Sequence, residues 1–433
     1  MLIEPVPILV FPLALMTVNI GNAILVAAAT DALPIPITAA KLVLSVCTAL
    51  GTLFLLIGLL KCVSMEAHCL ADEWVLQNSG AVAAGEMALM GIGAWLHDTL
   101  DATSAAGLAL WAFALVGILI QQGILVLCVV RMALSGRHAT PPKPVWQFLR
   151  ERAITAWVVP CVGVAAASAT GSMMLREAID STLLRLVLLY APLALGTTWM
   201  LILMLPLWYL VCARHALLEE PPCAILMAPP ALVLAGWLGA AGDSGHLCTS
   251  ALTHALAIIT VISSVPIVLL TPSYLNLCRP FAPSIATVGF PLAIGAISLL
   301  RYQAVVRASA HNATDVVIDA ACNVAALPAG SIESMNVSMH FAWADRIGAS
   351  ALLLIATLAA LVINARFAVA AGRHVIDVVQ VHHNGRHNAA IGAQSNSQEV
   401  DADCCCPLVL RSQTRGASAP HRMYTASVDI RHT

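Results

Sequence analysis

The sequence predicts an all-α polytopic membrane protein with ten transmembrane helices, and two observations predict it. Hydrophobic residues make up 60% of the 433 residues and charged residues only 10%, which is too little polar surface for a soluble chain of this length. The apolar residues also fall into ten stretches, each close to the ~20 residues that a helix needs to cross a bilayer. The predicted spans are residues 6–29, 37–60, 79–97, 105–130, 153–173, 186–210, 222–241, 247–271, 282–300 and 347–365.

The distribution of basic residues predicts the orientation of these spans. An even number of spans places both termini on one side of the membrane. The segment between the fourth and fifth spans is strongly basic and holds Arg131, Arg137, Lys143, Arg150 and Arg152. The turns on the opposite side are acidic or neutral. The positive-inside rule therefore predicts that both termini are cytoplasmic, in a multi-pass protein of the plasma membrane or an organelle membrane.

Composition divides the chain into a ten-helix transmembrane domain of residues 1–373 and a polar tail of residues 374–433. Within the domain, residues 302–346 are expected to form a long exoplasmic loop between the ninth and tenth spans. This loop contains two N-glycosylation candidates, Asn312 in Asn-Ala-Thr and Asn336 in Asn-Val-Ser. Unused sequons are the alternative interpretation.

The tail is predicted to be disordered and cytoplasmic, because it has no apolar periodicity. Three adjacent cysteines stand in it, Cys404, Cys405 and Cys406. They are lipidation candidates, since S-palmitoylation would hold the tail at the inner leaflet. Reduced thiols without a role are the alternative.

Glycine and proline recur near the centres of the odd-numbered spans. The positions are Gly85 with Glu86, Pro160 with Gly163, Pro229 with Pro230, and Gly289 with Pro291. Proline removes an intrahelical hydrogen bond, and such breaks are tolerated in a membrane where the backbone is buried in protein or lines an aqueous path. The pattern favours a transport pathway lined by these residues. Proline also occurs in even-numbered spans, so simple helix bending stays open as an explanation.

Five side chains inside the spans can be interpreted functionally or structurally. Glu86 is the carboxylate nearest the bilayer centre, so it could titrate during transport or only pack helices. Phe290 lies centrally between a glycine and a proline, although most membrane phenylalanines serve packing. His254 is expected to bond a backbone carbonyl, and the pair 121–122, two glutamines, to join helices by amide hydrogen bonds.

Motifs of soluble enzymes are missing from the sequence. It contains no G-x-S-x-G, H-E-x-x-H or Walker A lysine motif. No catalytic residue, cofactor or metal site is therefore predicted. The formal net charge of −2 and the lack of a folded basic patch predict no nucleic-acid partner.

Four short motifs, in order along the chain, resemble those of the tellurite-resistance/dicarboxylate transporter family. This family includes the plant slow-type anion channels and the fungal malate permease. The motifs are GEMALMGIGAWL at 85–96, AWVVPCVG at 156–163, ILMAPPA at 225–231, and FAPSIATVGFPLA at 281–293 followed by LLRY at 299–302. Each stands in the span with the matching number, and the resemblance extends over residues from about 6 to 370.

The resemblance implies a fold of five helical hairpins. In that fold the odd-numbered helices form an inner ring around a central pore, and three subunits form a homotrimer with one pore each. It also implies that a phenylalanine on the ninth helix gates the pore at mid-membrane, at the position of Phe290. Two departures from the family pattern stand out: Gly85-Glu86 replaces a usual Phe-Pro, and Cys161 replaces the second proline of the fifth-span motif. A glutamate in the pore favours a proton-coupled carrier, or a pore closed at rest.

The expected function is transport of a small anion, either a C4-dicarboxylate such as malate or an inorganic anion such as chloride, nitrate or sulfite. The expected partners are this anion, the membrane lipid and two further copies of the chain. The alternative is a receptor or scaffold that transports nothing and acts through its cytoplasmic tail. A membrane-embedded enzyme is disfavoured, because convergent intramembrane His, Asp and Glu side chains are missing from the sequence.

Overall fold

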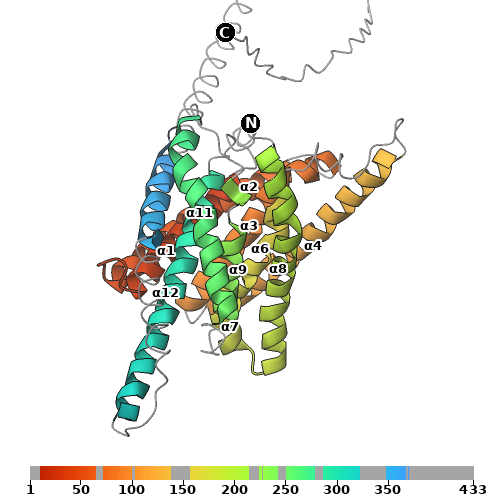
Figure 1. The fold of residues 1–433 in the computed structure, drawn as a ribbon. Helices are drawn as coiled ribbons and strands as arrows, with labels where there is room; N and C mark the ends of the chain where they lie inside the picture. Colours follow the sequence, from red (N-terminus) through yellow and green to blue (C-terminus); the bar gives the residue numbers. More distant parts are fainter. Residues whose placement is uncertain are drawn as a thin grey trace, which may run out of the picture. The chain divides into compact units, whose positions relative to one another are not determined.

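The computed structural model describes residues 10–64, 72–99, 103–137, 157–213, 224–226, 228–241, 250–277, 286–321, 348–366 and 369 (Figure 1). Nearly all of these residues are helical, and none of them lies in a strand. The elements are α1 (Val10–Ala29), α2 (Ile37–Ser64), α3 (Asp72–Thr99), α4 (Ser104–Arg137), α6 (Val158–Gly163), α7 (Ala165–Ala178), α8 (Thr182–Ala213), α9 (Pro229–Ala240), α11 (Ala251–Leu277), α12 (Ala286–Ala321) and the helix Gly348–Arg366.

The prediction of an all-helical chain with many membrane-spanning helices is confirmed. Within the described residues, nine helical segments are long and apolar enough to cross a bilayer, counting α6 and α7 as one. This is consistent with an integral multi-pass membrane protein. The seventh predicted span is shorter than expected: α9 has 12 residues, about 18 Å at 1.5 Å per residue, and a separate helical turn at 224–226 precedes it.

The chain divides into one unit of Met1–Val375 and a second of Ile376–Thr433. The second unit, with the three tail cysteines Cys404, Cys405 and Cys406, lies outside the described residues. So does the sequon at Asn336.

The ninth predicted span ends too early, which is a correction to the sequence analysis. That span was placed at 282–300 and followed by a loop from residue 302, but α12 continues to Ala321. The polar residues after position 300 indicated a helix end. In the structure Tyr302 and Gln303 are buried against the rest of the protein, so the helix continues. Asn312 consequently lies in a helix rather than in the predicted loop.

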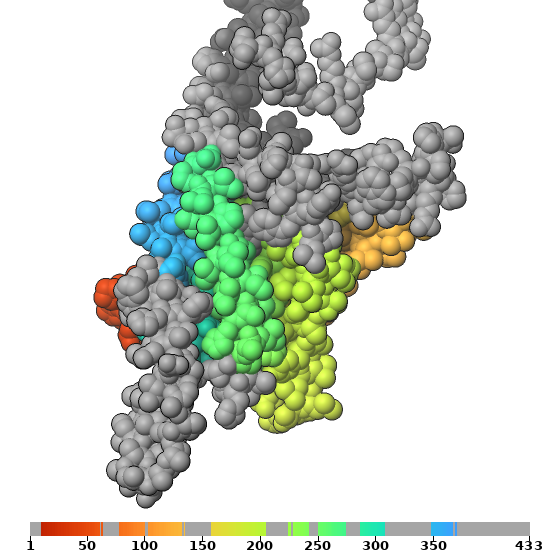
Figure 2. Space-filling view, viewed as in Figure 1, coloured from red at the N-terminus to blue at the C-terminus, as the bar shows by residue number. Residues whose placement is uncertain are grey.

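Buried and exposed helices alternate along the chain. Between 67 and 83% of the residues are buried in the spans of α1, α3, α6–α7 and α12, and in α9 every residue except Trp237 is buried. The corresponding share is 28 to 39% in α2, α4, α8, α11 and the helix Gly348–Arg366. On the face seen in Figure 2, α8 and α11 lie at the surface. Their exposed residues are large and aliphatic, as expected for helices that face lipid.

The contacts among the buried helices form a continuous series. α1 packs on α3 and α12, α3 packs on α6 and α7, α7 packs on α9, and α9 packs on α12. Four of the exposed helices pack on a buried helix that precedes them in the sequence: α2 on α1, α4 on α3, α8 on α7 and α11 on α9.

Glycines allow α3 and α4 to approach closely. A Cβ atom added to Gly107 would lie 2.5 Å from the carbonyl oxygen of Gly93 and 2.7 Å from the backbone nitrogen of His97. Both neighbours are backbone atoms, which cannot move aside without moving the helix. In a membrane, where lipid is as apolar as the helix surface, such close approach is a main source of helix association.

We therefore predict that Gly107→Ala destabilises the purified protein by about 1–3 kcal/mol, the usual range for overpacking. The measurement is thermal unfolding in detergent. Gly123, on the same helix, is the matched control because a Cβ atom added there meets nothing within 4 Å. Gly123→Ala should leave stability unchanged or raise it, since alanine is the better helix former. Equal effects of the two substitutions would show that the α3–α4 contact is not close.

Candidate functional site

Phe290 lies in the interior of the protein. It is the fifth residue of α12, between Gly289 and Pro291, and is 4% exposed. Its ring belongs to the continuous hydrophobic core that α1, α3, α6, α7, α9 and α12 share. The ring therefore does not face lipid.

The glycines predicted to break helices are packed against large side chains from neighbouring helices. A Cβ atom on Gly163 would lie 2.7 Å from the Met87 sulfur, and one on Gly85 would lie 3.1 Å from the ring of Phe11. A Cβ atom added to Gly289, directly before Phe290, would meet the sulfur of Met16. These three glycines thus make room for side chains of α1 and α3, and they leave no gap of their own.

The same contacts place these residues at one level of the bundle. Phe11 meets Gly85 and Val18 meets Gly91, so α1 and α3 run in the same direction. Met16 lies between Phe11 and Val18 and is therefore level with the middle of the α3 span, Asn78–Thr99. Phe290, next to the glycine that Met16 covers, lies at this level too. Four buried side chains lie at this level: Phe11, Met16, Met87 and Phe290. The ring of Phe11 packs against Gly58 of the outer helix α2 as well as against Gly85 of α3.

Two of the four predicted helix interruptions coincide with helix ends. Gly163 ends α6 and a single residue separates it from α7, with Pro160 inside α6. Pro229 and Pro230 begin α9, where their missing N–H groups cost nothing because the first turn has no acceptors for them. α3 is continuous through Gly85 and Glu86, and α12 is continuous through Gly289 and Pro291.

Glu86 lies at the contact between α3 and α4. A Cβ atom added to Gly117 of α4 would be 2.9 Å from Glu86 Oε1. Glu86 Oε2 is buried and has no hydrogen-bond partner, and the same holds for Ser79 Oγ and Gln121 Oε1 along this contact. Other residues of α3 face the buried helices: Gly85 packs against α1 and Met87 packs against α6. The Glu86 carboxyl is thus directed toward an outer helix.

The two glutamines of α4 join helices, as the sequence predicts. Gln121 Nε2 donates to the carbonyl of Ser79 in α3 at 2.5 Å, and Gln122 Nε2 donates to the carbonyl of Cys161 in α6 at 3.3 Å. His254 differs from expectation, because its Nδ1 is hydrogen-bonded to the hydroxyl of Tyr302 at 2.5 Å and not to a carbonyl.

A polar cluster that the sequence analysis missed connects α3, α4 and α7. His97 Nε2 lies 3.0 Å from Glu177 Oε2, and His97 Nδ1 lies 2.7 Å from Ser104 Oγ. His97 and Ser104 are seven residues apart, but Glu177 is 80 residues from His97, so no local pattern could have indicated the cluster. Within the part of the chain that the structure describes, no group of three or more His, Cys, Asp or Glu side chains could hold a metal ion.

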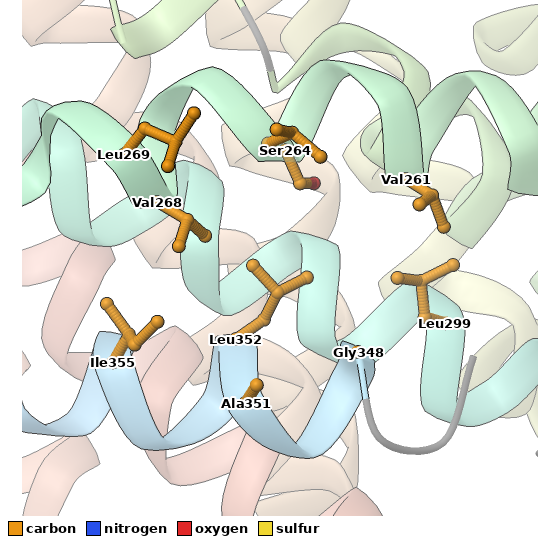
Figure 3. Close-up of a pocket in the computed structure, with 10 residues that line it drawn as sticks. Val261, Ser264, Val268, Leu269, Leu299, Gly348, Ala351, Leu352 and Ile355 are labelled. Atoms are coloured by element: carbon orange, nitrogen blue, oxygen red, sulfur yellow. The ribbon is translucent and has the colours of Figure 1, made fainter. Parts of the chain in front are cut away.

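An apolar groove lies between α11, α12 and the helix Gly348–Arg366 (Figure 3). It has a volume of about 230 Å³ and its lining is aliphatic except for Ser264, whose hydroxyl donates to the Thr260 carbonyl at 2.7 Å. Val265 and Leu269, which also line it, are 50% and 70% exposed. This groove opens on the outer surface and offers no polar group to an anion.

No protein-family model matches the chain, and no curated protein matches it. The resemblance to the tellurite-resistance/dicarboxylate transporters therefore depends on the four sequence motifs alone.

Proposed function

We propose that this protein transports small anions across a membrane, along an interior path between its buried helices. The observation that carries the proposal is the closed series of contacts from α1 through α3, α6–α7, α9 and α12 back to α1, with Phe290 buried among them. In this proposal these five elements form an inner ring, and α2, α4, α8, α11 and the helix Gly348–Arg366 lie outside it. The lower burial of the outer helices supports that division.

The four motifs support the same proposal independently, since each falls on an inner helix. They favour membership of the tellurite-resistance/dicarboxylate transporter family, with a homotrimeric assembly. The basic segment at 131–152 favours cytoplasmic termini. The substrate is then a C4-dicarboxylate such as malate, or chloride, nitrate or sulfite. α9 begins inside the bundle at buried Pro229, so its positive dipole end lies in the interior and favours an anion there.

The position of Glu86 removes an objection to anion transport. A carboxylate in the bore would repel an anion, but this side chain lies against Gly117 of an outer helix. An ionised carboxylate in an apolar interior needs a cation or several donors, and Glu86 Oε2 has neither among the described residues. We propose that Glu86 takes up and releases a proton at the α3–α4 contact during transport.

Phe290→Ala is expected to raise anion conductance in oocytes or liposomes, because it removes the proposed gate. Met16, which covers Gly289, occupies the same level, so Phe290→Ala with Met16→Ala should conduct more than Phe290→Ala alone. Phe54→Ala is the matched control: Phe54 is also buried, but it lies on the outer helix α2. Its replacement should leave conductance unchanged.

An unchanged or lower current in Phe290→Ala, at normal surface expression, would count against the gate. If deletion of residues 375–433 abolished function while Phe290 could be replaced freely, the protein would be a receptor or scaffold acting through its tail.

Glu86→Gln keeps the size of the side chain and removes its proton exchange. If the carboxyl couples protons to transport, flux should persist in this variant and lose its dependence on pH. The measurement is anion flux into proteoliposomes at several external pH values. If flux does not depend on pH in either the native protein or the variant, Glu86 does not couple protons to transport.

A further inference from the structure

Arg301 is a charged side chain deep within the helix bundle. It lies on α12 between residues that are almost completely buried, with Leu300 at 0% and Tyr302 at 2% exposure. Arg301 itself retains intermediate exposure. Part of the Arg301 side chain is therefore accessible, although its neighbours in the sequence are not.

Arg301 shares a face of α12 with Phe290. Eleven residues separate the two, which is close to three full turns at 3.6 residues per turn and about 16 Å along the axis. Ile294 and Ile297 continue the same stripe between them, and both are buried, at 5% and 4% exposure. If Phe290 closes an interior path, Arg301 therefore lies on that path, three turns farther along.

The positive charge of the Arg301 guanidinium has few hydrogen-bond or ion-pair partners among the described residues. Its Nη1 donates to the carbonyl oxygen of Ala169 in α7 at 3.4 Å, a long hydrogen bond. No carboxylate pairs with it within the described residues. α12 packs on α1, α9 and α11, so Arg301 reaches toward a helix outside these immediate neighbours. A guanidinium has five N–H donors, and a buried cation is costly unless an anion or several acceptors accompany it.

We propose that Arg301 is the anion-binding residue of the transport path, and that it favours planar oxyanions, carboxylate or nitrate, over chloride. The planar guanidinium presents two parallel N–H groups that fit two oxygens of one carboxylate or nitrate. A chloride ion can accept hydrogen bonds from the guanidinium, but because it is spherical it cannot match the two parallel N–H groups with two separate oxygens. The inference rests on the proposed anion transport and adds to it both the binding residue and the preferred geometry of the substrate.

The test compares nitrate with chloride in the conducting Phe290→Ala background. Arg301→Lys keeps the charge and removes the planar fork, so the nitrate-to-chloride permeability ratio should fall toward unity. Arg301→Gln removes the charge, and the half-saturating nitrate concentration should rise roughly ten- to a hundredfold, as for the loss of a hydrogen bond to a charged group.

Arg307 is the matched control. It lies six residues farther along α12, and its Nη1 also donates to a backbone carbonyl, that of Thr30, at 3.4 Å. It differs from Arg301 in being exposed. Arg307→Gln should leave both the permeability ratio and the half-saturating concentration unchanged.

A second measurement is independent of conduction. Nitrate at increasing concentration should raise the melting temperature of the purified native protein, and Arg301→Gln should lose this increase while Arg307→Gln keeps it. If Arg301→Gln does not fold, Arg301→Lys carries the test through the permeability ratio.

Wild-type values of the ratio and the half-saturating concentration in the Arg301 variants would overturn this inference and leave anion transport intact. Absence of any anion current from the Phe290→Ala background would contradict the proposed function, and this inference with it.

Discussion

The arrangement of the inner helices depends on the close contacts that small residues allow. Within a bilayer, apolar side chains gain little by leaving lipid, so helices associate through van der Waals packing and buried hydrogen bonds. α3 concentrates such contacts: Gly85 meets Phe11 of α1, Gly93 meets Gly107 of α4, and Met87 enters the space that Gly163 leaves on α6. A larger side chain at any of these glycines would push α3 away from a neighbour. The position of every residue around Phe290 follows from this packing.

One consequence concerns how an interior path could open. At mid-depth Phe290 lies level with the methionines Met16 and Met87, all three of them buried. The glycines hold the helix backbones close together. Methionine side chains are unbranched and adaptable. Under the proposed function, these side chains rotate to admit the anion and the helices keep their places. The gate is then the Phe290 ring together with the adaptable methionine Met16, which covers Gly289 beside it.

A second consequence concerns charge. Glu86 lies against α4, an outer helix, and Arg301 reaches from α12 toward α7 within the interior. The two side chains thus contact different helices, α4 and α7. A path between the inner helices would have a positive residue along it and no carboxylate from Glu86, which suits an anion. The cluster of His97, Glu177 and Ser104 lies elsewhere, where α3, α4 and α7 meet.

The sequence alone determined the helical membrane character of the chain and the ten regions where helices occur, because hydropathy and span length are local properties that need no knowledge of neighbours. It also indicated the glycines and prolines that prove to be packing sites or helix ends. Three features were decided only by tertiary structure. α12 extends past residue 301 because Tyr302 and Gln303 find buried environments. Glu86 faces α4, since the direction of a side chain depends on which helix packs beside it. Arg301 stands on the interior face with Phe290, at a distance from the Ala169 carbonyl that only the packing of α7 near α12 could set.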